Sequence, residues 1–306
     1  MKILIIGLGS IASKHIKALH LLNIKAELFA LRFQRDSKEE NGVKNLFSES
    51  ELDDDYDFAI ISNPTNLHFK AIDLLIEKFI PLFIEKPPLA SLKGAEELNT
   101  RLIKLNIKTY VACNLRFHPC IIYLKQFISS NNLRVNEVNV YCGSYLPDWR
   151  PEIDYRDNYS ANKNQGGGVH LDLFHELDYV HWIFGQPQSV KSYKTSCSSL
   201  KIDAIDYANY TLKYQTFSVS VILNYYRRTP KRTIEVLIDD KTVLVDLINN
   251  EINEDGKVLF SDPDFQVSDT YIKQMDFFIN KVLSDKTQMN TFTESIQILK
   301  NCLHDK

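Results

Sequence analysis

The chain has 306 residues, about two domains of ordinary size, which is enough to bury hydrophobic cores without disulfide or metal staples. Hydrophobic residues make up 44% and charged residues 25%, with only 10 glycines and 10 prolines, which excludes collagen, low-complexity disorder and a disulfide scaffold. The formal net charge of -3 gives no global basic field, so we expect no nucleic-acid partner.

The cysteines and the apolar runs bear on compartment and on metal binding. Five cysteines, an odd number, lie far apart with no C-x-x-C pair, so we expect a reducing compartment and no metal site. No stretch approaches the ~18 uninterrupted apolar residues of a membrane span. These features predict a cytoplasmic protein without a membrane partner.

Up to about residue 115, short apolar runs alternate with amphipathic helical segments. This alternation is typical of repeated βαβ units, and strands that are apolar throughout belong to a parallel sheet covered on both faces. We expect strands at 2–6, 26–31, 58–62, 80–84 and 108–113, and helices at 10–22, after Thr65 and at 91–105.

After residue 115 the pattern changes. We expect a helix at about 117–129, a strand near 135–145, a long polar and aromatic loop to residue 165, a helix at about 168–184, and closing helices at about 269–283 and 293–303. Between 190 and 260 the hydrophobic period is two, which indicates a half-buried antiparallel sheet. One face of that sheet would carry Phe217, Val219, Val221, Leu223 and Tyr225.

These patterns predict an α/β protein of two domains. An N-terminal Rossmann dinucleotide-binding domain would span residues 1–116. A C-terminal α+β domain with a large, mainly antiparallel open sheet would span residues 117–306, serve substrate binding and oligomerisation, and return its last helix to the N-terminal domain. The row from Phe217 to Tyr225, or a neighbouring face, is expected to bury another copy in a homodimer or homotetramer.

A G-x-G-x-x-A turn lies between the first expected strand and helix. Gly7 permits the tight turn and Gly9 lets the backbone approach a pyrophosphate, while Ser10 and Ile11 open a helix whose N-terminus favours anions. In this strand-turn-helix context the motif predicts a dinucleotide site. The alternative is a glycine turn that binds no ligand.

The end of the second strand reads Leu31-Arg32-Phe33-Gln34-Arg35, with a cation where the NAD fingerprint expects a carboxylate. Guanidinium binds phosphate as a charge-assisted fork, so Arg32 favours the 2′-phosphate of NADP, with NAD as the alternative cofactor. The competing interpretation is that Arg32 and Arg35 are ordinary solvated cations.

A second set of motifs follows later strands: Asn63-Pro64-Thr65-Asn66-Leu67-His68, Glu85-Lys86-Pro87-Pro88, Asn114-Leu115-Arg116-Phe117, and residues 166–172 with the sequence GGGVHLD. Together they resemble the Gfo/Idh/MocA oxidoreductases, the family of glucose-fructose oxidoreductase and inositol dehydrogenase, over nearly the whole chain. The resemblance implies that Asn63, Pro64 and His68 line the nicotinamide side, with Glu85 among the cofactor-binding residues, and that Asn114 and Arg116 belong to the substrate site.

The resemblance also places Lys86 near the nicotinamide and the substrate hydroxyl. Independently, a lysine at a strand end can orient a hydroxyl and stabilise developing alkoxide charge during hydride transfer. The alternative is a surface ion pair with Glu85.

In the family, an aspartate and a histidine four residues apart face the substrate, whereas here Asp172 and His175 are three apart. Positions i and i+3 of one helix share a face, so the two side chains could still converge on one hydroxyl. We assign His175 as proton donor or acceptor and Asp172 as a hydroxyl ligand or as the group that orients His175. A helix-start carboxylate and a buried structural histidine are the alternative.

The intervening loop is rich in groups that bind sugars and nucleotides, because aromatic faces stack on rings and arginines clamp phosphates. Its candidates are Tyr145, Trp149, Arg150, Tyr155, Arg156 and Tyr159, of which we assign Trp149, Arg150 and Tyr155 to the substrate. Such a loop resembles members of surface-polysaccharide sugar pathways. It could equally cover the second-domain sheet or an oligomer interface.

The sequence therefore predicts an NADP-dependent oxidoreductase that transfers hydride between the nicotinamide and a hydroxyl or keto carbon of a sugar, which could be nucleotide-linked. Lys86, Asp172 and His175 would act as the catalytic residues. A cofactor-binding sensor or regulatory protein and an imine or bile-pigment reductase are the alternatives on the same fold.

Overall fold

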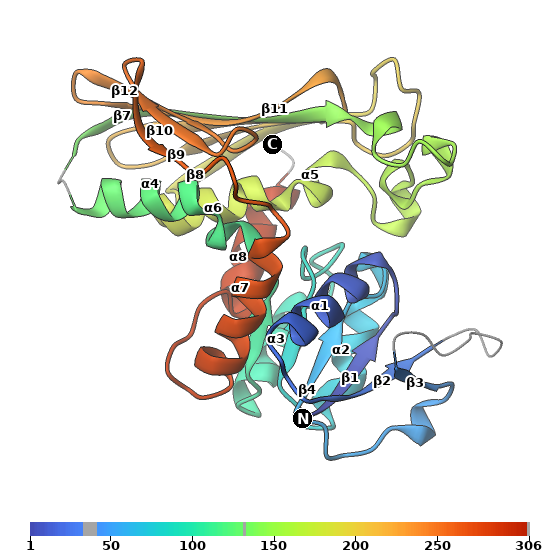
Figure 1. Cartoon of the computed structure of the whole chain (residues 1–306). Coiled ribbons are helices and arrows are strands. Elements are labelled where there is room, and N and C mark those ends of the chain that lie inside the picture. The colour runs from blue at the N-terminus through green and yellow to red at the C-terminus, as the bar shows by residue number, and fades with distance from the viewer. Residues whose placement is uncertain (33–41, 131–132, 305–306) are drawn as a thin grey trace. The chain divides into compact units, whose positions relative to one another are not determined.

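The computed structural model describes residues 1–32, 42–130 and 133–304, which divide into two compact units (Figure 1). The first unit contains Met1–Asn114 and Ser268–Leu299, and the second contains Leu115–Val267 and the chain from Lys300 on. Residues 268–299 thus lie in the first unit; the sequence-based division assigned 117–306 to the second domain and expected its last helix to return to the N-terminal domain. Among the described residues, no helix has the length and apolar character that a membrane crossing requires.

The first unit is built on a six-stranded parallel sheet of order β3-β2-β1-β4-β5-β6. Its strands are β1 (Lys2–Ile6), β2 (Glu27–Leu31), β3 (Val43–Leu46), β4 (Phe58–Ile61), β5 (Leu82–Ile84) and β6 (Thr109–Val111). Its crossover helices are α1 (Ser10–Leu21), α2 (His68–Ile76) and α3 (Ala95–Lys104). The strand order reverses between β1 and β4, and ligands of such sheets bind at that point, beyond the carboxyl ends of the strands.

The C-terminal part of the first unit begins with α7 (Asp269–Phe277), which continues as a π-helical turn over Phe278–Val282 and packs against α1. Phe278 is fully buried, and its ring lies 5.0 to 5.8 Å from the rings of Phe58, Phe83 and Tyr110 on three strands of the sheet. This aromatic cluster is why residues so late in the chain belong to the first unit. The last helix is α8 (Phe292–Leu303).

The second unit is built on an eight-stranded sheet of order β14-β13-β12-β11-β7-β10-β9-β8, in which only β7 and β10 pair in parallel. Its strands are β7 (Val135–Tyr145), β8 (Ser189–Thr195), β9 (Tyr207–Lys213), β10 (Ser218–Asn224), β11 (Tyr226–Ile238), β12 (Lys241–Asp246), β13 (Glu251–Glu254) and β14 (Lys257–Ser261). Helices α4 (Pro119–Ser130), α5 (Val169–Asp172) and α6 (Phe174–Phe184) cover one face (Figure 1). The predicted α/β fold, a Rossmann sheet followed by a mainly antiparallel sheet, is confirmed.

The period-two row on β10 faces the helices. Val219, Val221, Leu223 and Tyr225 are all 0% exposed, so this row forms the unit's own core. The expectation that it buries another copy is therefore wrong, because its apolar area is already covered within the chain. An oligomer through the opposite face of the sheet, here called the outer face, stays a prediction.

Candidate active site

The glycine turn after β1 has the geometry of a phosphate-binding turn. Gly7 has φ +88°, and a Cβ on it would lie 2.6 Å from the Cα of Asn63, so only glycine lets the two turns approach this closely. A Cβ on Gly9 would meet no atom within 4 Å, so open space lies beside the start of α1. That N-terminus, formed by Ser10 and Ile11, has neither a side-chain cap nor an acidic residue in its first turn. Its N–H groups and dipole remain available to an anion.

A cavity of about 200 Å³ lies in the first unit, where β1, β2 and β4 end. Its lining includes Ile6, Leu31, Asn63 and Leu67. Arg32 follows directly after β2, and its Nη1 atom is shielded from solvent with no hydrogen-bond partner among the described residues. Arg35 lies outside the described residues.

His68 joins the two loops that follow β4 and β5. Its Nε2 lies 2.9 Å from the Asn63 carbonyl oxygen, and its Nδ1 lies 3.1 Å from that of Pro87. Burial lowers the pKa of the imidazole below its usual value, which favours the neutral ring. His68 therefore holds the Asn63-Pro64 turn against the Glu85-Lys86-Pro87 turn, and its assignment to the cofactor site stays a prediction.

Glu85 is held by a residue that sequence reasoning missed. His15, on the buried face of α1, lies with its Nε2 2.6 Å from Oε1 of Glu85, and the backbone N–H of Lys86 donates to Oε2 at 3.1 Å. The carboxylate thus ties the helix of the phosphate turn to the loop that carries Lys86. The sequence signal for this pair is a histidine at a core position of α1, and that signal alone does not indicate Glu85 as the partner.

Asp172 forms the centre of a polar cluster in the second unit. Tyr159 donates its hydroxyl to Oδ1 at 2.9 Å, and the fully buried Tyr225 donates to Oδ2 at 2.5 Å. Burial, and next the charge of Asp172, raise the pKa of both phenols, so they stay protonated donors at neutral pH. The predicted role of Asp172 as a hydroxyl ligand fits this arrangement, because a carboxylate has further lone pairs to offer.

The glycine segment before Asp172 sets the position of Tyr159. A Cβ on Gly167 would lie 2.1 Å from the Tyr159 carbonyl oxygen, so the loop can pack here only against a glycine. Tyr159 and Tyr225 were absent from the assigned site residues. Tyr159 is one of several aromatic residues in its loop, and Tyr225 ends an apolar row whose pattern is typical of a core.

His175 and Asp172 do not share one helix. Asp172 ends α5, Leu173 leaves the helical conformation with φ −97° and ψ 33°, and α6 begins at Phe174, so His175 lies in its first turn. The expected single helix at 168–184, and the i, i+3 face derived from it, are therefore wrong. The orientation of His175 is set by the start of α6, not by helical spacing from Asp172.

The assigned loop residues divide into two groups. Trp149 packs edge-on against Tyr225 at 5.3 Å, and the Arg150 guanidinium lies 6.0 Å from the Tyr159 ring, so both adjoin the Asp172 cluster. Tyr155 instead donates to the Leu200 carbonyl oxygen at 3.0 Å.

Asn114 and Arg116, which the sequence analysis assigned to the substrate site, form hydrogen bonds with other residues of the protein. Arg116 is 1% exposed and forms a two-pronged ion pair with Asp178, at 2.9 and 2.7 Å. Asn114 is also buried and donates to Thr270 Oγ1 at 2.6 Å. Both side chains thus hold elements of their own units together, and their assignment to the substrate site stays a prediction.

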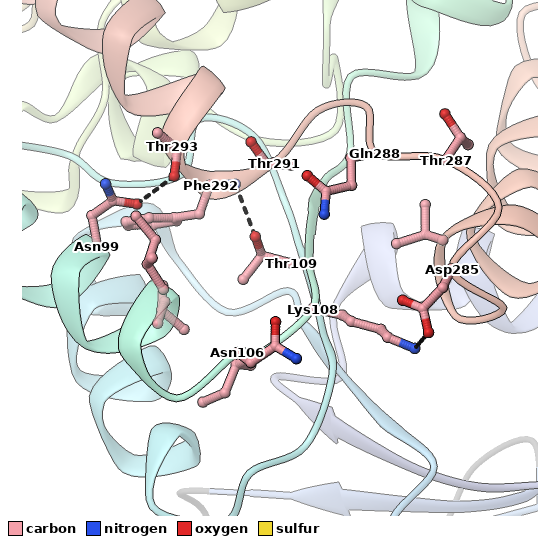
Figure 2. A pocket seen from close by; sticks show the side chains of 14 residues that line it. Asn99, Asn106, Lys108, Thr109, Asp285, Thr287, Gln288, Thr291, Phe292 and Thr293 are labelled. Atoms are coloured by element: carbon pink, nitrogen blue, oxygen red, sulfur yellow. Dashed lines mark hydrogen bonds and ion pairs between the residues drawn. The ribbon is translucent and has the colours of Figure 1, made fainter.

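A second cavity, larger than the one beyond β1, β2 and β4, is lined by none of the predicted site residues. It measures about 520 Å³ and lies in the first unit, between the end of α3, the start of β6 and the loop before α8 (Figure 2). Lys108 and Asp285 pair across 2.8 Å, and Thr293 donates to Asn99, so four of its polar side chains are paired with one another.

Two family models match the chain. One, described as "Oxidoreductase family, NAD-binding Rossmann fold", matches residues 1–112, and the other, the GFO/IDH/MocA C-terminal domain, matches residues 122–243. Among curated proteins, the scyllo-inositol 2-dehydrogenase (NADP(+)) IolW of Bacillus subtilis is 25% identical over 159 residues, or 52% of this chain and 43% of that protein. The match thus spans under half the length of that relative.

Solved structures with a similar fold cover nearly the whole chain. UDP-N-acetylglucosamine 3-dehydrogenase GnnA from Acidithiobacillus ferrooxidans has a TM-score of 0.78 at 18% identity, covering 100% of this chain and 96% of its own. The WlbA dehydrogenase from Bordetella pertussis, in complex with NADH and UDP-GlcNAcA, has a TM-score of 0.81 at 18% identity, covering 98% and 94%. At these identities the likeness shows the fold.

Proposed function

Because the chain belongs to the Gfo/Idh/MocA family of NAD-binding oxidoreductases, we propose that it is an NADP-dependent dehydrogenase or reductase of a sugar or a nucleotide sugar. The observation that carries the proposal is the turn at Gly7 and Gly9, where open space adjoins an uncapped helix N-terminus. The Nη1 of Arg32, at the end of β2, is shielded from solvent and has no hydrogen-bond partner among the described residues, which supports the phosphorylated cofactor.

The residues present fit a dinucleotide. Gly7, Gly9, Ser10 and Ile11 would hold its pyrophosphate, and the 200 Å³ cavity beyond β1, β2 and β4 would take its adenosine part. Once bound, the nicotinamide supplies hydride transfer to or from a carbon. His15 and His68 act indirectly, since each fixes a loop that presents a cofactor-binding or catalytic residue.

The roles of the catalytic residues follow from their chemistry. Lys86, at the carboxyl end of β5, would donate hydrogen bonds to the substrate oxygen and stabilise alkoxide character. His175 would accept or donate the proton of that oxygen, because an imidazole titrates near neutral pH. Asp172, fixed by Tyr159 and Tyr225, would accept a hydrogen bond from a sugar hydroxyl.

The test screens NADP⁺ with scyllo-inositol and UDP-N-acetylglucosamine, the compounds that the names of IolW and GnnA give, and follows NADPH formation. Lys86→Ala should lower turnover at least tenfold while NADPH affinity changes less than twofold. Lys104→Ala, an exposed lysine on α3, serves as the matched control. Equal loss of turnover and NADPH affinity in Lys86→Ala contradicts the assigned role, and NADPH binding without turnover on any sugar favours a sensor.

A further inference from the structure

The first turn of α6 carries His175 without a continuous helix behind it. Leu173 separates α5 from α6, and α5 itself is a single turn of four residues. Leu173 also provides no side-chain cap to the start of α6. A one-turn helix is marginal by itself, so α5 does little to fix the direction of α6. The half-buried His175 therefore depends on contacts that this turn makes elsewhere.

The residue next to His175 anchors this turn to the sheet. Glu176 is fully buried, and Arg232 of β11 donates from Nε to its Oε1 atom at 2.7 Å, with Nη2 2.5 Å from the same oxygen. Burial alone would lower the pKa of the Arg232 guanidinium, but the charge of Glu176 outweighs that effect and raises this pKa above its usual value. The guanidinium therefore stays charged, and a charge-assisted contact through two nitrogen atoms restricts the direction of the carboxylate as well as its distance.

Asp172 is anchored to the same part of the chain by a separate contact. The hydroxyl of the fully buried Tyr225 donates to Asp172 Oδ2, and Tyr225 directly precedes β11, which contains Arg232. Residues 225 and 232 thus hold the two predicted groups, Asp172 directly and His175 through its neighbour. These two anchors take the place of the single helix that the sequence spacing predicted.

The body of α6 has an anchor of its own. Asp178, two residues beyond Glu176, forms the buried ion pair with Arg116, which precedes α4. Loss of the Glu176–Arg232 pair should therefore release the first turn of α6 while the rest of the helix stays in place. A displacement of about 1 Å in a catalytic group can lower turnover by about 100-fold, so the anchor of this turn bears on rate.

We propose that Glu176 and Arg232 are positioning residues for His175: their ion pair fixes the first turn of α6 and so sets the direction in which the imidazole meets the substrate oxygen. This role rests on the proposed function, because it takes His175 as the residue that exchanges a proton with that oxygen. Glu176 itself has no exposed surface from which to reach a substrate.

The experiment measures steady-state kinetics of the whole chain with NADP⁺ and with scyllo-inositol or UDP-N-acetylglucosamine, whichever supports turnover. The double variant Glu176→Leu/Arg232→Met removes both charges, so it leaves no unpaired charge in the core. We expect its kcat to fall at least tenfold. The KM of the sugar and the affinity for NADPH should change less than twofold, because Asp172 and the turn at Gly7 keep their contacts.

Combination with His175→Ala separates positioning from a structural role. If the ion pair acts through His175, the variant with all three substitutions should match the kcat of His175→Ala within twofold, because it has no imidazole left to misdirect. A structural role would lower kcat further in the combined variant. Arg232→Lys keeps the charge but offers one nitrogen in place of two. It should lower kcat at least threefold, and the same comparison with His175→Ala applies to it should the double variant not fold.

The matched control is Val245→Ala, at a fully buried position of β12, the strand that packs against α4. It should unfold at a lower urea concentration yet keep the wild-type kcat within twofold. Wild-type kcat in a folded double variant overturns the proposed role, as do additive losses in the combined variant or an equal loss of kcat in Val245→Ala. No turnover by the wild type with either sugar overturns the proposed function and this role with it, whereas the other outcomes overturn this role alone.

Discussion

The two glycines of the phosphate turn should respond in opposite ways to the same added methyl group. Gly9 has φ −103°, a conformation open to alanine, and a Cβ there meets no atom within 4 Å. Gly9→Ala should therefore cost no more than about 1 kcal/mol of the free energy of unfolding, mainly through a poorer N-cap. The methyl group would fill the space through which a pyrophosphate reaches α1, so NADPH should bind at least tenfold more weakly, about 1.4 kcal/mol.

Gly7→Ala supplies the contrast. Its φ of +88° and the 2.6 Å approach to the Asn63 Cα add strain and overlap, which should cost about 2–3 kcal/mol of folding free energy or more. Urea unfolding measures stability, and quenching or enhancement of NADPH fluorescence measures affinity. Wild-type NADPH affinity in a folded Gly9→Ala protein would refute the reasoning, as would equal destabilisation by the two substitutions.

Two further predictions concern buried groups. Arg116→Met should lower the free energy of unfolding by about 3–5 kcal/mol, because it leaves the buried carboxylate of Asp178 without its ion-pair partner. In urea unfolding, the double variant Arg116→Met/Asp178→Leu should recover part of that loss. A double variant less stable than the single one argues against the ion pair. The pKa of His68 is lowered in the folded state, so below its usual 6.5 the unfolded chain binds the extra proton and stability falls as pH falls. When the pH is lowered from above to below 6.5, the free energy of unfolding of His68→Gln should fall less than that of the wild type. Equal decreases in the two proteins contradict a buried neutral His68.

Local sequence patterns predicted those elements whose residues are buried whichever other elements pack against them. The apolar runs of β1, β4 and β5 predicted strands, because strands of a parallel sheet covered on both faces are apolar throughout. The strand β3 was missed, since Val43–Leu46 has a single buried residue and so no periodic signal. The break at Leu173 was missed as well, because nothing in the residue types there forbids a continuous helix.

The candidate site was predictable where a motif has a fixed local geometry. The turn at Gly7 and the placement of Lys86 at a strand end depend on neighbours in sequence. The pairs His15–Glu85 and Tyr225–Asp172 join residues 70 and 53 positions apart, and only packing brings them together. The same applies to the ion pair of Arg116 with Asp178, which joins residues 62 positions apart.

The proposed oxidoreductase depends most directly on cofactor binding at the turn that contains Gly7 and Gly9. Fluorescence titration of the purified chain with NADPH and, separately, NADH tests it. We predict tighter binding of NADPH, and loss of that preference in Arg32→Asp with NADH affinity retained. A preference for NADH would contradict the role given to Arg32, and absence of binding by either nucleotide would contradict the proposed oxidoreductase itself.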